Sequence, residues 1–531
     1  MILQDIKNLL INGNNSQALL EIDKLVDPDN LQVKLLKSRI LYIEHDLNGA
    51  LSIIHQILDK CRTEEQRKIE FCSLSIWFGC SFNENADLQA TYQYLSRAEK
   101  LFQSFTHLEK DDLQEYIGIH LFNKGEFEYM IYFWDEPKTY ALFEGNLESA
   151  LNYLNQAVVA FQAASDKYGI AKAYNKIGEI LQKKGNFESA LKFLKKSMKA
   201  SQQVSYTRAF VISNQYIGLD NLMRGNLDTS LKIYMECLEI SEREKFDIVT
   251  AYNLRIIGRL FFVRGELKTS LKYFKKALAK SNTIGSNTES SCNLFNLTLT
   301  SLEMDNNDQA NKYLAQLQEL NNVNNSRIID LRTKLANALI FKRAKRVKYK
   351  VDSQRILEKI SDQIIDEDNL YVFSMFNLCT IHELTVFAML NLCEILLVEL
   401  KNYEEDEVLQ QAVGIIQKIR NIALTQNSET LVVETLLLEA KFSMIKLDFS
   451  KAEKLLEQSS IITIEQNLKK LSYKVENERK LFQSEMDRIA QLAQKSAKVQ
   501  DNIKHTRLED YLTTMIKLFK YNEDSDDLGS Q

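Results

Sequence analysis

One short pattern recurs four times in this chain at a fixed step of 40 residues. The copies begin at Gly145, Gly185, Gly225 and Gly265, and each has a small residue five positions later. A weaker fifth copy keeps the register at 308–310. Self-similarity at a fixed period identifies stacked supersecondary units, each of which contacts mainly its neighbours. The sequence therefore predicts an array of repeats and not a single compact core.

Each repeat is predicted to be an antiparallel pair of helices. Apolar residues recur at three- and four-residue spacing over 171–181, and a second helical segment follows over 189–198. The Gly-Asn dipeptide between them supplies a tight turn, because both residues tolerate left-handed backbone angles.

Small residues stand twelve positions apart on the two helices of a repeat. A glycine inside a helix costs about 1 kcal/mol relative to alanine, so its recurrence indicates a close approach of the paired helix. The pairs of small structural positions are Gly178 with Ala190, Gly218 with Ser230, and Gly258 with Ser270.

This placement of small residues resembles the tetratricopeptide repeat (TPR), in which two small positions let helices A and B of a hairpin cross closely. The usual TPR has about 34 residues and HEAT or armadillo units have about 40–47, so the 40-residue period lies nearer the second range. The placement of Gly and Ala favours the first, and the resemblance is therefore to TPRs with longer helices, like those of Pins-type polarity adaptors. Serine replaces alanine at 230 and 270, and the usual proline after helix B is missing. The resemblance implies an all-α fold, a right-handed TPR superhelix (α-solenoid) of antiparallel helix pairs with a helical C-terminal extension.

The rest of the chain resembles archaeal TPR-repeat proteins that combine such repeats with a basic helix junction and a helical C-terminal segment. The match is strongest over 110–320 and looser over 325–485. It implies a fold and an adaptor-like character, and no activity.

Composition narrows the class of protein further. With 2 prolines, 16 glycines and 45% hydrophobic residues in 531, the chain is typical neither of disorder nor of a β-sandwich. The net charge of −5 implies no general attraction to nucleic acid or anionic membranes. We expect a cytoplasmic protein with reduced thiols, because there is no signal-peptide pattern, no apolar run of 18 residues and no CxxC among the seven cysteines.

Turn signals divide the chain into six predicted segments. They are degenerate N-terminal TPR-like hairpins (1–104), an irregular repeat with a register break (105–144), the core TPR array (145–323), C-terminal TPR-like helix pairs (324–466), capping or coiled-coil helices (467–521) and a disordered acidic tail (522–531).

Two of these segments leave alternatives open. Met130 precedes Ala150 by only half a repeat, and Pro137 predicts that a helix ends near Trp134. This aromatic break is either a packing irregularity or a partner-binding notch. The helix predicted over 468–500 either caps the array or forms a homodimer.

No catalytic, metal-binding or cofactor-binding residues are predicted. The segment beginning at His382 starts like a zinc-protease motif, but Val386 occupies the position of the second ligand. Phosphate-binding glycine loops and a GxSxG nucleophile elbow are absent from the sequence, and the six histidines form no local cluster. We therefore expect a protein that is not an enzyme and binds no cofactor.

The TPR resemblance implies which side chains face a concave groove. The predicted peptide groove consists of Lys172, Asn175, Gln215, Leu219, Leu222, Tyr252, Arg255, Arg259, Phe262 and Phe295. The remaining groove-facing positions are Glu179, Gln182, Ile212, Cys292, Leu299 and Leu302. Arg255 and Arg259 are spaced i, i+4 and are expected to hold carboxylates by forked hydrogen bonds. The alternative is that C-terminal helices or core packing cover the apolar members.

The hypothesis is a non-catalytic scaffold or adaptor that captures a peptide with apolar and acidic residues in this groove. A ligand- or peptide-responsive sensor is the first alternative. The second is an anionic partner, RNA or lipid, bound by a basic junction, although no specific nucleic-acid motif supports it. The alternative for this junction is a solvated helix end without a partner, where cations near the C-terminus of a helix are favourable. The junction consists of Lys342, Arg343, Lys345, Arg346, Lys348 and Lys350.

Overall fold

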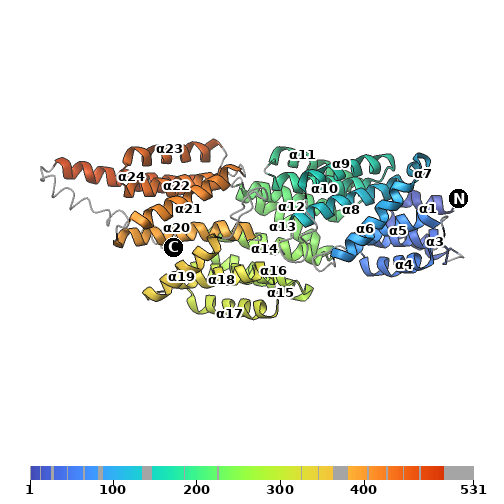
Figure 1. Cartoon of the computed structure of the whole chain (residues 1–531), viewed down its shortest axis with the longest axis horizontal. Coiled ribbons are helices and arrows are strands. Elements are labelled where there is room, and N and C mark those ends of the chain that lie inside the picture. Colours follow the sequence, from blue (N-terminus) through green and yellow to red (C-terminus); the bar gives the residue numbers. More distant parts are fainter. Residues whose placement is uncertain are drawn as a thin grey trace, which may run out of the picture. The chain divides into compact units, whose positions relative to one another are not determined.

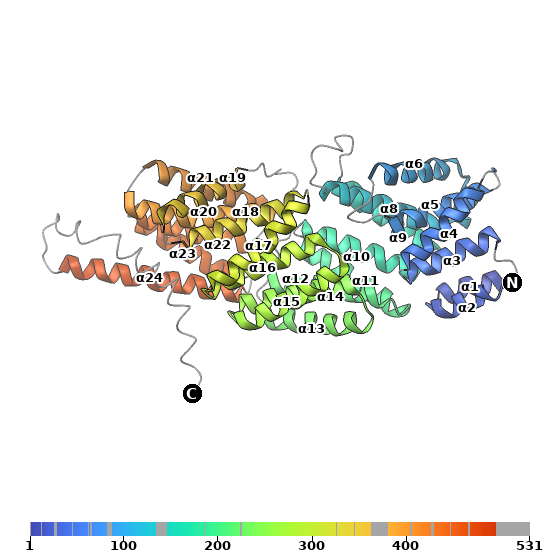
Figure 2. The same cartoon turned by 90° about the horizontal axis from the view of Figure 1, so that it is seen from below.

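The computed structural model describes residues 2–494, apart from 82–87, 134–145, 363–380 and gaps of up to three residues in other turns. The described residues form 24 helices and no strand, which confirms the all-α class. They divide into two compact units, unit 1 (residues 1–217) and unit 2 (residues 218–531). Within each unit, successive helices run back and forth as hairpins (Figures 1 and 2).

Unit 1 is built from hairpins in which α1 pairs with α2, α3 with α4, α5 with α6, α8 with α9 and α10 with α11. The helices are α1 (Ile2–Ile11), α2 (Asn15–Asp23), α3 (Leu31–Ile43), α4 (Leu47–Lys60), α5 (Arg67–Ser81), α6 (Leu88–Ser104), α7 (His107–Asp112), α8 (Gln114–Phe133), α9 (Leu147–Ala163), α10 (Lys167–Lys183) and α11 (Phe187–Gln203). The first helices of successive hairpins, α3, α5, α8 and α10, pack against one another in that order. We call them the A row of unit 1.

Helix α12 (Thr207–Met223) runs across the boundary between the units. The helices that follow are α13 (Leu227–Arg243), α14 (Asp247–Val263), α15 (Leu267–Ile284), α16 (Asn287–Glu303), α17 (Asn307–Val323), α18 (Arg327–Lys342), α19 (Val347–Ser361), α20 (Ile381–Tyr403), α21 (Asp406–Thr425), α22 (Glu429–Ile445), α23 (Phe449–Glu465) and α24 (Lys469–Gln494). Helices α14, α16, α18 and α20 pack in succession, and with α22 they form the A row of unit 2.

The glycines predicted to lie at close helix crossings do so. A Cβ atom added at any of the three would lie 2.7–2.8 Å from a side chain of the paired helix, closer than real Cβ contacts allow. The facing pairs are Gly178 with Leu194, Gly218 with Tyr234, and Gly258 with Phe274. The repeat therefore requires glycine because two helices touch, which offsets its poor helix propensity.

The serines that replace alanine add a hydrogen bond to this crossing. Ser230 Oγ donates to the carbonyl of Gly218 at 2.8 Å, and Ser270 Oγ donates to the carbonyl of Gly258 at 2.8 Å. Both serines are fully buried. A hydroxyl is tolerated there because its donor is satisfied by the opposite helix.

The turns that join one repeat to the next share a left-handed residue. Ser165, Ser205, Lys245 and Gly285 follow one another at 40-residue steps and have φ of 56°, 51°, 56° and 77°. Such a residue commonly ends a helix, and it is usually glycine because a side chain is strained there. The repeat geometry therefore imposes this conformation on two serines and a lysine, which their identity alone does not predict.

The register break predicted at 130–150 lies within one helical hairpin. Helix α8 pairs directly with α9, and a Cβ added at Gly125 would lie 2.8 Å from Leu154. Residues 134–146, most of which lie outside the described residues, separate the two helices of this hairpin. Helix α8 ends at Phe133, as Pro137 predicts, but the aromatic notch falls largely on 134–145, outside the described residues. Tyr129, at its start, is buried.

The last described helix covers the end of unit 2. Leu471, Val475 and Phe482 of α24 are buried in a cluster with residues of α22 and α23, and Figure 1 shows α24 alongside both helices. This is the capping arrangement, and it leaves these three residues unavailable to a second copy of the chain. The predicted acidic tail at 522–531 lies outside the described residues.

Between residues 2 and 494, none of the described helices has the length and apolar character needed to cross a membrane.

Candidate functional site

The arginines predicted to bind a partner are buried in unit 2. Arg255 is 1% exposed and its Nε donates to Glu289 at 3.0 Å, while Arg259 is 4% exposed and its Nη1 donates to Asn296 at 3.2 Å. Tyr252 and Phe262 are half-buried beside these guanidinium groups. The expectation of two free guanidinium groups in an open groove is corrected, because both bind residues of the next A-row helix.

Core packing covers the apolar members of the predicted groove in unit 2. Every residue of α16 from Ser290 to Leu302 is buried, which includes Phe295 and the lesser groove positions Cys292 and Leu299. Leu222 is also fully buried, whereas Leu219 is half-buried. For these buried residues the alternative named above, coverage by core packing, is what the structure shows.

Other buried cations of unit 2 are paired between helices of the A row and its cap. Arg332 on α18 donates to Ser291 Oγ at 2.7 Å and to the carbonyl of Thr288 at 3.0 Å. Lys441 on α22 lies 2.8 Å from Glu478 on α24, and both side chains are at most 10% exposed. These interactions offset the cost of burying the two cations and join neighbouring helices, so their role is structural.

The predicted basic junction is divided between structural and exposed cations. Lys342 pairs with Glu394 and Asn391, and Arg343 binds Glu303, Asp305 and the carbonyl of Leu302. The remaining described members, Arg346, Lys348 and Lys350, are exposed at the start of α19, and Lys345 lies outside the described residues. Two of the six cations are therefore neutralised within unit 2.

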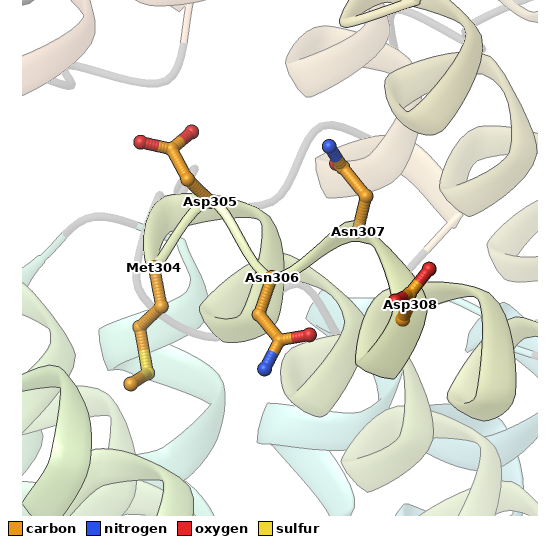
Figure 3. A pocket seen from close by; sticks show the side chains of 5 residues that line it. All are labelled: Met304, Asp305, Asn306, Asn307 and Asp308. Atoms are coloured by element: carbon orange, nitrogen blue, oxygen red, sulfur yellow. The ribbon is translucent and has the colours of Figure 1, made fainter.

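An open hollow of about 510 Å³ lies at the turn between α16 and α17. Figure 3 shows that its lining side chains all come from this one turn, with Asp305 and Asn307 on the opposite side from Met304 and Asn306. Asp305 binds Arg343 and Asn306 caps α17 through Gln309 N. The polar groups of Asp305 and Asn306 therefore stabilise this turn and the start of α17. In the described part of the chain, no three His, Cys, Asp or Glu side chains are grouped to hold a metal ion.

The A row of unit 1 contains the predicted groove residues Lys172 and Asn175, and Lys172 is less enclosed than the A-row arginines of unit 2. Asn175 is buried and donates to Ser213 Oγ at 2.9 Å, and Gln215 is also buried. Lys172, by contrast, is half-buried on α10 and lies among aromatic and charged residues from two other A-row helices, α3 and α8. We call this group the charged cluster of unit 1. Its members are Arg39, Tyr42, Glu115, Phe122, Glu126, Tyr129, Asp166, Tyr168, Lys172, Lys176 and Glu179.

Arg39 ties α3 to two distant helices. It is 1% exposed, its Nε donates to Glu115 on α8 at 2.8 Å, and its Nη2 donates to Asp166, the N-cap of α10, at 3.0 Å. Its guanidinium also lies over the rings of Tyr42 and Tyr168, 5.6 and 5.4 Å from their centroids. Nη1 is buried and has no hydrogen-bond partner among the described residues. The contacts of Arg39 span 76 and 127 residues of sequence.

Lys172 binds an aromatic pair and no carboxylate. Its Nζ donates to the hydroxyl of Tyr42 at 2.5 Å and lies 4.8 and 4.6 Å from the ring centroids of Tyr42 and Phe122. Burial lowers the pKa of Lys172, partly offset by the charge of Glu126. Burial also raises the pKa of Tyr42, so its hydroxyl keeps its proton at neutral pH.

One turn further along α10, Lys176 is fully paired. Its Nζ lies 2.9 Å from Glu179 and 3.3 Å from Glu126 of α8, and it sits over the ring of Tyr129. The Tyr129 hydroxyl donates to Glu179 at 2.5 Å. Burial by itself would lower the pKa of Lys176, but Glu179 and Glu126 outweigh burial and raise it. Two neighbouring lysines on one helix therefore differ in one respect: only Lys176 has carboxylate partners.

Sequence reasoning found Lys172, Asn175 and Glu179 but missed the residues of α3 and α8. Arg39 and Tyr42 belong to a degenerate repeat, and their partners on α10 are about 130 residues away. One signal was present in the sequence: Arg39 is a cation in a helix whose other buried positions, which include Leu35, Leu36 and Ile40, carry no charge. A buried charge of this kind implies a partner, although not which one.

Comparison with known proteins agrees with the repeat architecture. The tetratricopeptide repeat family profile matches residues 139–203. The fold is similar to the apo form of the quorum sensor NprR from B. thuringiensis, with a TM-score of 0.53 and 13% identity over 74% of this chain and 100% of that chain. It is also similar to a Rap protein complexed with Competence and Sporulation Factor, with a TM-score of 0.54 and 14% identity over 75% of this chain and 99% of that chain. No curated protein sequence matches closely enough to count as a relative. The tetratricopeptide repeat profile therefore covers one part of the array, and the two solved structures share its helical-repeat fold.

Proposed function

We propose that this chain is a non-catalytic scaffold or sensor that binds a peptide segment of a partner on the A row of unit 1. The observation that carries the proposal is the charged cluster, where Lys172 is half-buried, lacks a carboxylate partner and lies between aromatic rings. Extended or helical peptides bind repeat arrays by placing anchors against such aromatic and charged side chains.

Two further observations support unit 1 over unit 2. Lys172, Lys176, Glu126 and Glu179 are each partly exposed, so a peptide can reach them, whereas the A-row arginines of unit 2 are enclosed. The similar folds include a protein described as a quorum sensor and one solved with Competence and Sporulation Factor. They offer precedent for a peptide-responsive role on this fold.

The test is selection of peptides against the full chain. A displayed library of short random peptides is panned on the folded protein, and hits are resynthesised with a photo-crosslinking residue. We expect saturable binding by fluorescence anisotropy, with crosslinks that map by mass spectrometry to α3, α8 or α10. Absence of saturable binding, or crosslinks confined to other helices, would contradict the proposal. An Arg255→Ala/Arg259→Ala variant would mainly test folding, because both side chains are buried and bonded.

A further inference from the structure

Three exposed cations lie at the start of α19, and we call Arg346, Lys348 and Lys350 the α19 cations. Among the described residues, no carboxylate lies within ion-pair distance of any of the three. Lys342 and Arg343, a few residues earlier in the same junction, are both paired with carboxylates of unit 2. The later half of the basic junction therefore keeps a positive charge that the earlier half has lost.

The direction of α19 places these charges where the helix does not favour them. The N-terminus of a helix is the positive end of its dipole, so cations are unfavourable there and anions are favourable. The first turn of α19 contains no acidic residue, and the side chain of Arg346 makes no capping hydrogen bond. A solvated helix end was expected to hold cations near a C-terminus, whereas these three lie at an N-terminus. The helix dipole and the side chains therefore attract an anion to the same point.

Apolar side chains are exposed on the same turn. Val347 is 74% exposed and Val351 is 48% exposed, while the ring of Tyr349 packs on Phe341 with 5.1 Å between the centroids. Single exposed apolar residues are ordinary on a protein surface, but here they alternate with cations along residues 346–351, all of which are exposed. The occupant that fits this turn therefore carries several carboxylates together with apolar neighbours.

The chain itself contains such a segment after its last described helix. Residues 523–527 include four carboxylates, and Tyr521 and Leu528 flank them. Residues 495–522 would span about 40 Å as a helix and about 95 Å when extended, which allows 523–527 to reach other helices of unit 2. Because both groups belong to one chain, their encounter is intramolecular, and individually weak exposed ion pairs are sufficient to hold it.

We propose that the acidic segment 523–527 docks on the first turn of α19 and pairs its carboxylates with the α19 cations. Tyr521 and Leu528 then supply apolar contacts to the exposed Val347 and Val351. The start of α19 is thus an interaction surface for an acidic segment of the same chain, and RNA or an anionic membrane would have to displace that segment. This inference is independent of peptide binding by unit 1.

Hydrogen exchange of the full chain measures the docking. The tail-neutral variant replaces the four carboxylates by amides (Glu523→Gln, Asp524→Asn, Asp526→Asn and Asp527→Asn). Most amides at the start of a helix lack an intrahelical acceptor and exchange quickly unless something covers them. Exchange over 346–350 should be at least about threefold faster in the tail-neutral variant, as expected when several exposed ion pairs are lost. In about 1 M salt, where the Debye length is about 3 Å, the two proteins should exchange alike.

A matched control removes the same number of negative charges elsewhere. The control variant carries Glu236→Gln, Glu239→Gln, Glu453→Gln and Glu457→Gln, which change exposed carboxylates of α13 and α23. It should leave exchange over 346–350 unchanged, because the proposed contact depends on the position of the acidic segment and not on net charge. Thermal unfolding of every variant verifies that it is folded.

Crosslinking with a carbodiimide, which joins a carboxylate to a lysine amine with loss of water, tests the contact itself. In a mixture of light and isotope-labelled heavy chains, we expect links from Lys348 or Lys350 to 523–527 within one copy. Lys348→Glu/Lys350→Glu should accelerate exchange over 346–350 as the tail-neutral variant does. Adding Asp526→Lys and Asp527→Lys to that variant should restore slow exchange and links between the two segments, which simple loss of reactive groups cannot do.

Three results would overturn the inference. The first is equal exchange over 346–350 in the wild type and the tail-neutral variant at low salt. The second is links that join only light to heavy chains, which would assign the α19 cations to the acidic segment of a second copy. The third is equal protection of 346–350 by phosphatidylserine vesicles in both proteins, which would show that no acidic segment competes for this surface.

Discussion

The A rows of the two units treat buried charge differently. In unit 2, Arg255 and Arg259 each bind a residue of the next A-row helix, and Lys441 binds Glu478. In unit 1, Arg39 binds two carboxylates while Lys172 binds none. Since a buried charge is normally paired, the unpaired one is a candidate for function. One hairpin design can therefore carry enclosed cations that are bonded to a neighbouring helix as well as a half-buried lysine without a carboxylate partner.

The two rows also differ in how far along the chain their partners lie. The bonds of Arg255 and Arg259 span 34 and 37 residues, which is one repeat. Those of Arg39 to Asp166 and Lys172 to Tyr42 span 127 and 130 residues. Unit 2 is thus held by nearest-neighbour interactions, as in a simple repeat array, whereas unit 1 adds ties between its early and late hairpins.

The largest expected effect comes from breaking the Arg39 pairs. Arg39→Met leaves Glu115 and Asp166 without their cation, and losing one partner of a buried ion pair costs about 3–5 kcal/mol. The matched change in unit 2, Arg255→Met, should cost only about 1–3 kcal/mol, because Glu289 is 27% exposed and can be hydrated, whereas the Arg39 partner Asp166 is only 11% exposed. Urea unfolding measures both. Equal losses would remove the distinction between the two rows.

Acid should act on unit 1 through Glu99 of α6. Hydrogen bonding by His120, followed by Lys124, lowers the pKa of Glu99 from 4.5 to about 2, against the opposing effect of burial. Because the folded pKa is below the unfolded one, this stabilisation is present above pH 4.5 and is lost as the pH falls towards 2. A shift of this size corresponds to about 3 kcal/mol at most.

Hydrogen exchange provides the readout for that acid effect. Between pH 4.5 and 2.5, α6 and α8 should lose protection, after correction for the intrinsic pH dependence of exchange. Glu99→Gln should already be less protected at neutral pH and should change less on acidification. The same acid dependence in wild type and Glu99→Gln would show that other carboxylates control the response.

Overpacking the helix crossing should affect both units equally, because the hairpin is what they share. Gly178→Leu in unit 1 and Gly258→Leu in unit 2 should each cost about 1–3 kcal/mol, since even a Cβ meets Leu194 or Phe274 at 2.7–2.8 Å. Gly414→Ala is the control: no atom lies within 4 Å of its added Cβ, and stability should rise by about 0.5–1 kcal/mol. Thermal melting measures all three changes. A melting temperature of Gly178→Leu equal to that of the wild type would contradict the assigned register.

The smallest expected effect is a gain at the left-handed turns. Ser205→Gly in unit 1 and Lys245→Gly in unit 2 remove a side chain that is strained at φ of 51° and 56°. Relief of this strain should stabilise the folded state by about 1 kcal/mol at each position, and the greater backbone entropy that glycine loses on folding offsets part of that gain. Their melting temperatures should rise slightly and by similar amounts, whereas Gly285→Ala, at φ of 77°, should lower the melting temperature. A lower melting temperature in both Ser205→Gly and Lys245→Gly would show that these two side chains stabilise the folded state.

The hairpin follows from the sequence alone. Residues near one another in the chain specify the 40-residue period, the end of α8 before Trp134 and the close crossings at Gly178, Gly218 and Gly258. Helical periodicity, turn chemistry and small-residue spacing are local properties, so one sequence is sufficient to predict them.

Which A-row side chains are enclosed and which are partly exposed depends on packing between helices that are distant in the sequence. The resemblance to TPR grooves placed Arg255, Arg259 and Phe295 on a binding surface, but packing of later helices buried all three. Conversely, the ties from Arg39 to Asp166 and from Tyr42 to Lys172 bring together residues about 130 positions apart. Burial and charge pairing depend on what several helices bring to one point in space, and no local pattern specifies that convergence.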